Sequence, residues 1–269
     1  METFITVIKE HIECKNQIFK LAMSDILRTY RGAALGWLWA IIKPSIFVFV
    51  MWFAISMGLR SEPNIGEHPF ILWLMCGLIP WFYMSEMLGR GMMSIKKYNY
   101  LVTKMKFPVS TIPTFVSISK ITINIVLMSI VVLIFALSGF PPSIYAVQIP
   151  FYFLCSFLFF TLYSLCTAPL AVISKDFSNI IKSFITPIFW LSGVLWDPDV
   201  MPLWFRRVLL FNPVTFISRG FRDSLVHNVW FFSPERRNHI IGFFIMLLIM
   251  FCLAMFTYGK SRKEIPDVL

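Results

Sequence analysis

The sequence predicts an all-α polytopic membrane protein with six transmembrane helices, an amphipathic N-terminal helix and a re-entrant helical hairpin between spans five and six. Two observations support this fold class. Of the 269 residues, 58% are hydrophobic and 14% are charged, whereas soluble proteins carry about 25% charged residues. Several apolar stretches also reach about 20 residues, enough to cross a hydrocarbon layer of ~30 Å. A soluble protein of this composition would expose large apolar patches, so we reject that alternative.

The first expected element is an amphipathic helix over residues 4–28. At one residue per 100°, its apolar side chains fall within an arc of roughly 140°, and most of its charges lie outside that arc. Such a helix could lie flat on the cytoplasmic membrane surface or pack against a soluble partner, and the pattern fits both. Because charges interrupt its apolar positions, we expect no cleavable signal peptide.

Six apolar runs are long enough to be spans. An even number of spans places both termini on one side of the membrane. Lysines and arginines gather in the N-terminal segment, in the link between spans two and three, and in the C-terminal tail. The positive-inside rule therefore predicts cytoplasmic termini in a multi-pass plasma-membrane protein, with residues 1–269 forming one transmembrane domain. The expected spans are residues 33–59, 68–91, 110–138, 148–173, 178–196 and 239–258.

Residues 197–238 depart from the charge rule, because they should be extracellular and yet contain six arginines. The stretch LWFRRVLLF (203–211) is amphipathic. Asn212 followed by Pro213 is typical of a helix N-cap and the first helical residue. We therefore expect two short helices that re-enter the membrane from outside and hold the arginines at the outer interface.

The link SIKKYNYLVTKMKFP (94–108) contains four lysines and no acidic residue. If it is a helix ended by Pro108, one face is aromatic and aliphatic and another carries lysines. A short cytoplasmic helix of this kind fits a groove on a partner protein. The alternative is a basic anchor attracted to anionic lipid. The residues expected to contact a partner are Lys97, Tyr98, Tyr100, Leu101, Lys104 and Met105.

The sequence lacks the motifs of several classes of catalytic, nucleotide-binding and metal sites. There is no G-x-x-x-x-G-K-[ST] phosphate loop and no H-E-x-x-H or C-x-x-C motif. The five cysteines fit neither a disulfide framework nor a zinc site. Glu86 is the one clear acidic candidate inside a span, with Arg90 four residues later as its expected partner. We expect no catalytic site, metal or cofactor on this chain. The net charge of +10 follows from the positive-inside rule, so no nucleic acid partner is expected.

Three stretches resemble one family, in order along nearly the whole chain. RTYRGAALGWLWAIIKP (28–44) is similar to the R-Y-R-x-S-x-L-G-x-L-W motif at the first span of polysaccharide-exporting ABC transporter permeases, with departures at Thr29 and Ala34. GLIPWFYMSEMLGRGMMSI (77–95) resembles their second-span signature. NPVTFISRGFRDSL (212–225) resembles the segment before their last span. YNYLVTKMKFPVSTIP (98–113) and ITPIFW (185–190) look most like the wall teichoic acid permeases of Gram-positive bacteria.

The resemblance implies an ABC-2 type permease that works as a homodimer and moves a lipid-pyrophosphate-linked glycopolymer outward across the plasma membrane. Its implied partners are a second copy of itself, two ATP-binding cassette subunits that carry ATP and Mg²⁺, the lipid-linked anionic glycopolymer and membrane lipid. Segment 94–108 would then be the coupling helix. The favoured polymer is wall teichoic acid, and the alternative is an O-antigen or capsular polysaccharide. From another class, a stand-alone lipid-carrier flippase is also open.

Two further groups of residues carry functional expectations. Arg28, Arg31 and Lys43 lie near the inner end of the first expected span and could attract phosphates of an incoming substrate, although Lys43 could equally be a snorkelling side chain. Aromatic side chains offer stacking faces to sugars along a path, or they form an interfacial belt. The residues expected to line the path are Trp52, Trp81, Phe82 and Tyr83.

Overall fold

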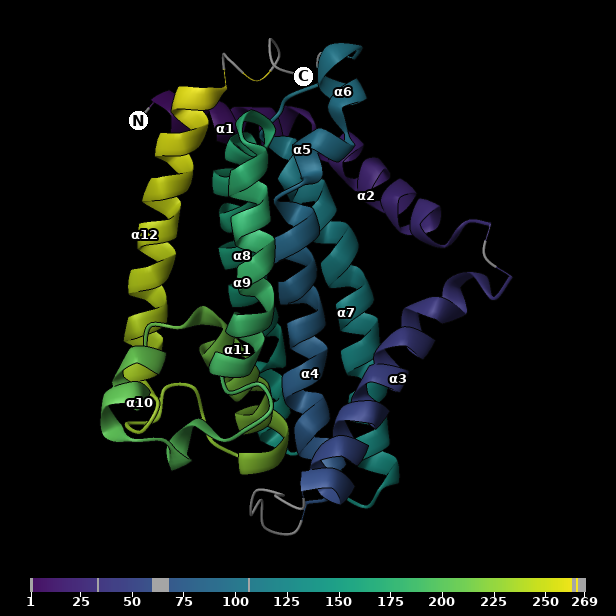
Figure 1. Ribbon diagram of the computed structural model, residues 1–269, viewed down its shortest axis with the longest axis vertical. Helices are drawn as coiled ribbons and strands as arrows, with labels where there is room; N and C mark the ends of the chain where they lie inside the picture. Colours follow the sequence, from purple (N-terminus) through teal and green to yellow (C-terminus); the bar gives the residue numbers. More distant parts are fainter. Residues whose placement is uncertain (1, 33, 60–67, 106, 263–264, 266–269) are drawn as a thin grey trace.

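The structure is a computed structural model that describes residues 2–32, 34–59, 68–105, 107–262 and 265. Within these ranges the chain is built from helices and turns, and no described residue lies in a β-strand. The long helices stand side by side and run most of the length of the molecule (Figure 1). This part of the chain therefore has the all-helical fold that its apolar runs predict.

Five helical stretches are long and apolar enough to cross a membrane. They coincide with five of the six expected spans, so those five helices are confirmed. They are Gly36–Gly58, which contains η1 (Gly36–Leu38), α3 (Trp39–Phe53) and most of η2 (Ala54–Leu59); Phe70–Gly91, which joins α4 (Phe70–Glu86) to η3 (Met87–Gly91); α7 (Thr111–Leu137); Ile144–Ile173, which joins η4 (Ile144–Gln148) to α8 (Ile149–Ile173); and α12 (Arg237–Ser261).

The remaining expected span, residues 178–196, falls on α9 (Lys175–Leu191). This helix has 17 residues and packs beside α8. It ends earlier than predicted because the chain turns at Gly193, whose φ of 68° belongs to the left-handed region that glycine tolerates. Its crossing of the membrane stays a prediction.

The spans Phe70–Gly91 and Ile144–Ile173 contribute most to the core, because they are the most buried of the five. In the most apolar part of each span, 72% of the Phe70–Gly91 window is buried but only 11% of the Gly36–Gly58 window. α4 contacts α3, α7 and α11, while α8 contacts α7 and α12. Helix α3 therefore leaves most of its surface for lipid or for another protein chain.

The N-terminal segment forms two helices where one was expected over residues 4–28. They are α1 (Glu2–Glu13) and α2 (Lys15–Tyr30), with a break at Cys14. α1 lies across one end of the bundle and contacts α7 and α12, whereas α2 packs along α7 (Figure 1). The break lets the two helices contact different parts of the bundle, while Phe4, Ile5, Ile8 and Ile12 of the predicted apolar stripe stay exposed.

One end of the molecule gathers the segments that were predicted to share a side. α1, the C-terminal end of α12, and the short helices α5 (Ser94–Lys97) and α6 (Asn99–Thr103) lie together there (Figure 1). The opposite end holds η5 (Pro198–Val200), α10 (Leu203–Leu209), α11 (Pro213–Arg222) and η6 (Asp223–His227). The two ends thus carry the groups of segments that the sequence assigns to opposite membrane faces.

Residues 197–238 contain the two short helices that were predicted. Asn212 caps α11 as expected, because its side-chain oxygen accepts a hydrogen bond of 2.9 Å from the amide of Val214. The residues from Val214 to Arg222 are all buried, and α11 packs against α4, α8 and α12. By contrast, α10 exposes Leu203, Trp204 and Val208. One helix of the pair thus penetrates the bundle and the other lies on its surface.

Candidate substrate and coupling sites

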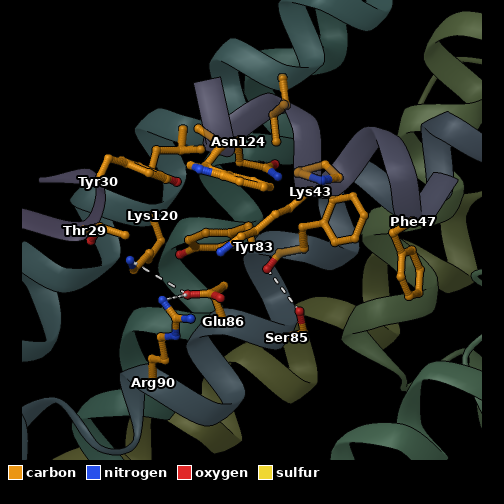
Figure 2. A pocket seen from close by; sticks show the side chains of 16 residues that line it. Thr29, Tyr30, Lys43, Phe47, Tyr83, Ser85, Glu86, Arg90, Lys120 and Asn124 are labelled. Atoms are coloured by element: carbon orange, nitrogen blue, oxygen red, sulfur yellow. Dashed lines mark hydrogen bonds and ion pairs between the residues drawn. The ribbon is translucent and has the colours of Figure 1, made fainter. Parts of the chain in front are cut away.

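A cavity of about 340 Å³ lies where the C-terminal end of α2 meets α3, α4 and α7 (Figure 2). Its lining combines charged, polar and aromatic side chains. The charged residues are Lys43, Glu86, Arg90 and Lys120, the polar ones include Thr29, Ser85 and Asn124, and the aromatic ones are Tyr30, Trp39, Phe47, Phe82 and Tyr83.

Glu86 and Arg90 form the ion pair that their spacing predicts. Arg90 Nη1 lies 3.2 Å from Glu86 Oε2, one helical turn away. The same carboxylate oxygen lies 3.8 Å from the ammonium of Lys120 on α7, so Glu86 stands between two cations (Figure 2). With Lys43 included, the lining holds three cations and one carboxylate. The cavity therefore favours an anion.

Lys120 is the most deeply buried of these cations, with a side chain only 6% exposed. Its ammonium lies 3.8 Å from Glu86 Oε2 and 3.8 Å from Asp25 Oδ2, both beyond hydrogen-bonding distance. Lys43, by contrast, is exposed and sits 5.6 Å above the ring of Trp39. Lys120 thus reaches the cavity from inside the bundle, and Lys43 reaches it from the surface.

Asp25 on α2 joins three parts of the chain, and sequence reasoning missed it. It is 2% exposed. Its Oδ1 accepts hydrogen bonds from Lys97, at 2.9 Å, and from Tyr98, and its Oδ2 accepts one of 2.7 Å from Ser119 on α7. Burial alone would raise the pKa of Asp25, but the Tyr98 hydroxyl, the Lys120 charge, Lys97 and Ser119 together lower it to about 2.

A signal for Asp25 was present in the sequence. The buried residues of α2 are Ile18, Ala22, Asp25 and Ile26, which recur at the spacing of one helix face. An acid inside an apolar stripe has to be paired, because an isolated buried carboxylate is very costly. Asp25, beside Ile18, Ala22 and Ile26 on this face, therefore required a partner, which the sequence pattern alone did not identify.

The expected coupling segment, residues 94–108, contains two short helices, α5 and α6, in place of one. The break comes at Tyr98, whose ring packs 4.9 Å from that of Phe115 and whose hydroxyl binds Asp25. Tyr98 and Leu101 are buried in this chain, and Tyr100 is half-buried and accepts a 3.4 Å hydrogen bond from Arg28. Lys97 is bound to Asp25 but half-exposed, and Lys104 and Met105 are exposed. Lys106 lies outside the described residues.

The residues expected to meet the substrate are only partly brought together. Lys43 lines the cavity. Arg28 and Arg31 are exposed at the end of α2, outside the cavity lining, and Arg28 is turned toward Tyr100.

The four path aromatics are also divided. Phe82 and Tyr83 line the cavity, and the Tyr83 hydroxyl makes a 2.8 Å hydrogen bond with Ser117. Trp81 is buried with its ring 5.1 Å from that of Phe189 on α9. Trp52 is half-buried near the other end of α3. Within one chain, these rings do not line a single hollow.

At the opposite end, four of the six arginines of residues 197–238 make side-chain contacts within the protein. Arg222 is 1% exposed, donates a 2.7 Å hydrogen bond to the carbonyl of Gly193, and lies 3.4 Å above the ring of Trp73. A Cβ atom on Gly77 would come within 2.4 Å of its guanidinium. Two of the stretches that carry the family resemblance therefore meet at Gly77 and Arg222.

Two aspartates pair with three of the other arginines at this end. Asp223 pairs with Arg236 through bonds of 2.6 and 2.9 Å and with His227 at 2.9 Å, and Asp199 pairs with Arg206 and Arg219. Burial alone would raise the pKa of Asp223, but His227 and Arg236 hold it below its usual range. This pairing accounts for four of the six arginines of the expected outer segment: they balance the carboxylates of Asp199 and Asp223 and the backbone carbonyls of Gly193 and Val194.

The part of the chain that the structure describes contains no group of three or more His, Cys, Asp or Glu side chains that could hold a metal ion.

Comparison with known proteins gives a family and several relatives. The sequence pattern of ABC-2 type transporters matches residues 16–226. The chain is 27% identical over 195 residues to the O-antigen export system permease protein RfbA of Myxococcus xanthus, which covers 71% of this chain and 72% of that protein. It is 22% identical to the Klebsiella pneumoniae protein of the same name, over 88% of this chain and 90% of that one. It is also 22% identical to the polysialic acid transport protein KpsM of Escherichia coli, over 91% of this chain and 92% of that one.

Proposed function

This chain belongs to the ABC-2 type transporter family, and from that membership we propose that it is the membrane-spanning permease of an ATP-driven polysaccharide exporter. The observation that carries the proposal is the agreement between the family match and relatives that are permeases for surface polysaccharides over most of their length. The positively charged, aromatic-lined cavity supports it, because it suits an anionic group attached to sugars.

The polymer we propose is an O-antigen or a capsular polysaccharide. The relatives named above are O-antigen permeases and a polysialic acid transport protein. They favour this alternative over wall teichoic acid, the narrower prediction from the sequence. We further propose that the polymer travels as a lipid-linked glycopolymer and that Lys43 and the cavity receive its charged end.

The end that holds α1, α5 and α6 is the proposed cytoplasmic end, by the positive-inside rule. There we propose that ATP-binding cassette subunits dock on the exposed part of segment 94–108. Among its exposed residues, Lys104 and Met105 are the proposed contacts, while Lys97 and Tyr98 pass any movement to α2 through Asp25. The sparsely buried α3 supports pairing with a second copy of the chain. Such pairing would also bring together the expected path aromatics, which do not line a single hollow within one chain.

Depletion of the protein in its own cells tests the function. We expect surface polysaccharide to decrease while lipid-linked polymer accumulates on the cytoplasmic side of the membrane. An impermeant sugar-oxidising reagent should then react with this polymer only after the cells are permeabilised. Sugar analysis of the accumulated polymer then separates O-antigen or capsule from a polyol-phosphate polymer. Normal surface polysaccharide after depletion would contradict the proposal.

A stand-alone lipid-carrier flippase is the second candidate class, and co-purification separates the two. The proposed permease should be isolated with an ATPase subunit in gentle detergent, and ATP hydrolysis by that complex should respond to lipid-linked polymer. A flippase that acts alone would move its lipid in the absence of any ATPase.

A further inference from the structure

Helix α10 has an apolar face that no described part of this chain covers. Leu203 is 70% exposed, Trp204 is 67% exposed and Val208 is 59% exposed. The opposite side of the helix holds it to the protein through Leu209, which is only 2% exposed. Large apolar side chains gathered on one exposed face mark a contact with lipid or with another protein.

The same face carries one cation without an internal partner. Of the two arginines in α10, Arg206 pairs with Asp199 at 3.0 Å. Arg207 is exposed and forms no ion pair with any residue that the structure describes. At 100° per residue, Arg207 falls between Leu203 and Trp204 around the helix axis, one turn further along. The exposed face of α10 therefore combines apolar side chains with one guanidinium that is left to bind something outside this chain.

The position of α10 places this face next to a lipid-facing surface. α10 lies beside the N-terminal end of α12 (Figure 1), and the chain just after α10 packs there so closely that a Cβ on Gly242 would collide with the Leu210 carbonyl. Only 17% of the most apolar window of α12 is buried, and the exposed side chains near this end are Ile241, Phe244 and Ile245. Because α12 is long and apolar enough to cross a membrane, its exposed surface suits lipid, and α10 adjoins that surface where the helix begins.

Lipid fits the face of α10 better than a second copy of the chain does. α3, the helix proposed for pairing, lies on the other side of the molecule (Figure 1). Tryptophan is enriched where spans meet the membrane surface, and the arginine stem packs along apolar groups while its guanidinium stays at the polar level. A helix with one apolar face and a basic residue lies in the plane of the interface and is attracted to anionic lipid.

We propose that α10 anchors this end of the protein in one leaflet of the membrane. Leu203, Trp204 and Val208 lie among the acyl chains just below the headgroups, and Arg207 binds the phosphate of an anionic phospholipid. The partner is membrane phospholipid and not the exported polymer, so the inference goes beyond the proposed function. By the proposed topology, the leaflet is the outer one.

Quenching by brominated phospholipids tests the anchor in the full chain, reconstituted in nanodiscs. A fluorophore on Val208→Cys reports its surroundings, once Cys14→Ser and Cys252→Ser have removed the thiols that are not buried. We expect brominated phosphatidylcholine to quench this fluorophore strongly, because the side chain lies among acyl chains. A fluorophore on Glu235→Cys, an exposed position before α12, is the control and should stay nearly unquenched. Both substitutions alter exposed side chains, so both variants should fold.

The phosphate contact is tested by comparing brominated phosphatidylglycerol with brominated phosphatidylcholine at the Val208→Cys fluorophore. We expect the anionic lipid to be favoured about fivefold, which is the effect of one basic side chain near an anionic membrane surface. Arg207→Gln should abolish this preference while quenching by phosphatidylcholine stays strong. Arg237→Gln is the matched control, because Arg237 is an exposed arginine at the start of α12 and lies outside α10. It should leave the preference unchanged.

Three outcomes would overturn the proposal. Quenching at Val208→Cys no stronger than at Glu235→Cys would place the face of α10 in water. An unchanged lipid preference in Arg207→Gln, or an equal loss in Arg237→Gln, would remove the specific phosphate contact. Efficient cross-linking of two Val208→Cys chains, with quenching lost when they pair, would assign the face to a second copy. The experiment measures no transport, so its failure would leave the proposed function standing.

Discussion

The ammonium of Lys97 lies 2.9 Å from Asp25 Oδ1, 72 residues away along the chain. This contact joins the short link between α4 and α7 to the N-terminal helix α2. The same carboxylate binds Ser119 on α7 and lies near Lys120, which lines the cavity. If a partner protein displaces the link, these polar contacts therefore connect that movement to the residues that line the cavity.

Asp25→Asn should destabilise the protein by about 2 kcal/mol at neutral pH. A pKa lowered from 3.8 to about 2 corresponds to about that free energy of unfolding. Because the folded-state pKa is depressed, this stabilisation is fully present above pH 4 and is lost as the pH falls toward 2. Unfolding in mixed micelles measures both effects.

The control for this variant is Glu13→Gln, which alters an exposed carboxylate of α1. It should change the free energy of unfolding only slightly. If the two variants were equally stable, the Asp25 contacts would not hold α2 to the bundle.

Gly77→Ala should be strongly destabilising, although alanine is normally the better helix residue. The added Cβ would lie 2.4 Å from the Arg222 guanidinium and 2.7 Å from the carbonyl of Val194. Arg222 would be displaced from its buried partners, at a cost of about 3 kcal/mol. Gly58→Ala is the matched control, because a Cβ there meets nothing within 4 Å. Equal stability of the two variants would show that α4 and α11 are not tightly packed at this point.

The long helices could be predicted from the sequence because the length of an apolar run limits where a chain can cross a membrane. The end of α9 could not be predicted in this way, because it depends on the turn at Gly193. The break at Cys14 was also missed: the apolar stripe of residues 4–28 is continuous around a helix, and only docking against two parts of the bundle divides it.

The site was harder to predict than the fold. Glu86 and Arg90 are neighbours on one helix, so their pairing follows from spacing alone. Asp25 and Lys120 meet only through tertiary packing, and a lone lysine in a span looks the same whether it snorkels or lines a cavity. The sequence pattern placed Tyr98 and Leu101 on one apolar helix face. It did not show whether that face packs into the core of this chain or into a groove of a partner protein.

Cysteine labelling should establish the orientation. In a background without the five native cysteines, Val200→Cys and Met105→Cys place thiols on exposed positions at opposite ends of the molecule. An impermeant thiol reagent should label Val200→Cys in intact cells and Met105→Cys only after permeabilisation. The reverse pattern would invert the proposed topology.

Lys104→Glu combined with Met105→Ala should impair coupling without unfolding the protein, because both side chains are exposed. We expect less ATPase subunit to co-purify, by about tenfold if a hot spot is lost. Lys20→Glu, which reverses the charge of an exposed lysine outside segment 94–108, is the control. Undiminished co-purification and export in the double variant would remove segment 94–108 from the proposed interface.

Transport by reconstituted protein tests the central claim most directly. The chain and its co-purified ATPase subunit would be placed in proteoliposomes with lipid-linked polymer accessible on the outer surface, and movement of the polymer into the lumen would be followed by its protection from a glycosidase. We predict protection that requires ATP and is absent with an ATPase subunit unable to hydrolyse it. Protection that is equal with and without ATP, or none with an active ATPase subunit present, would contradict the assignment of this chain as the permease of a polysaccharide exporter.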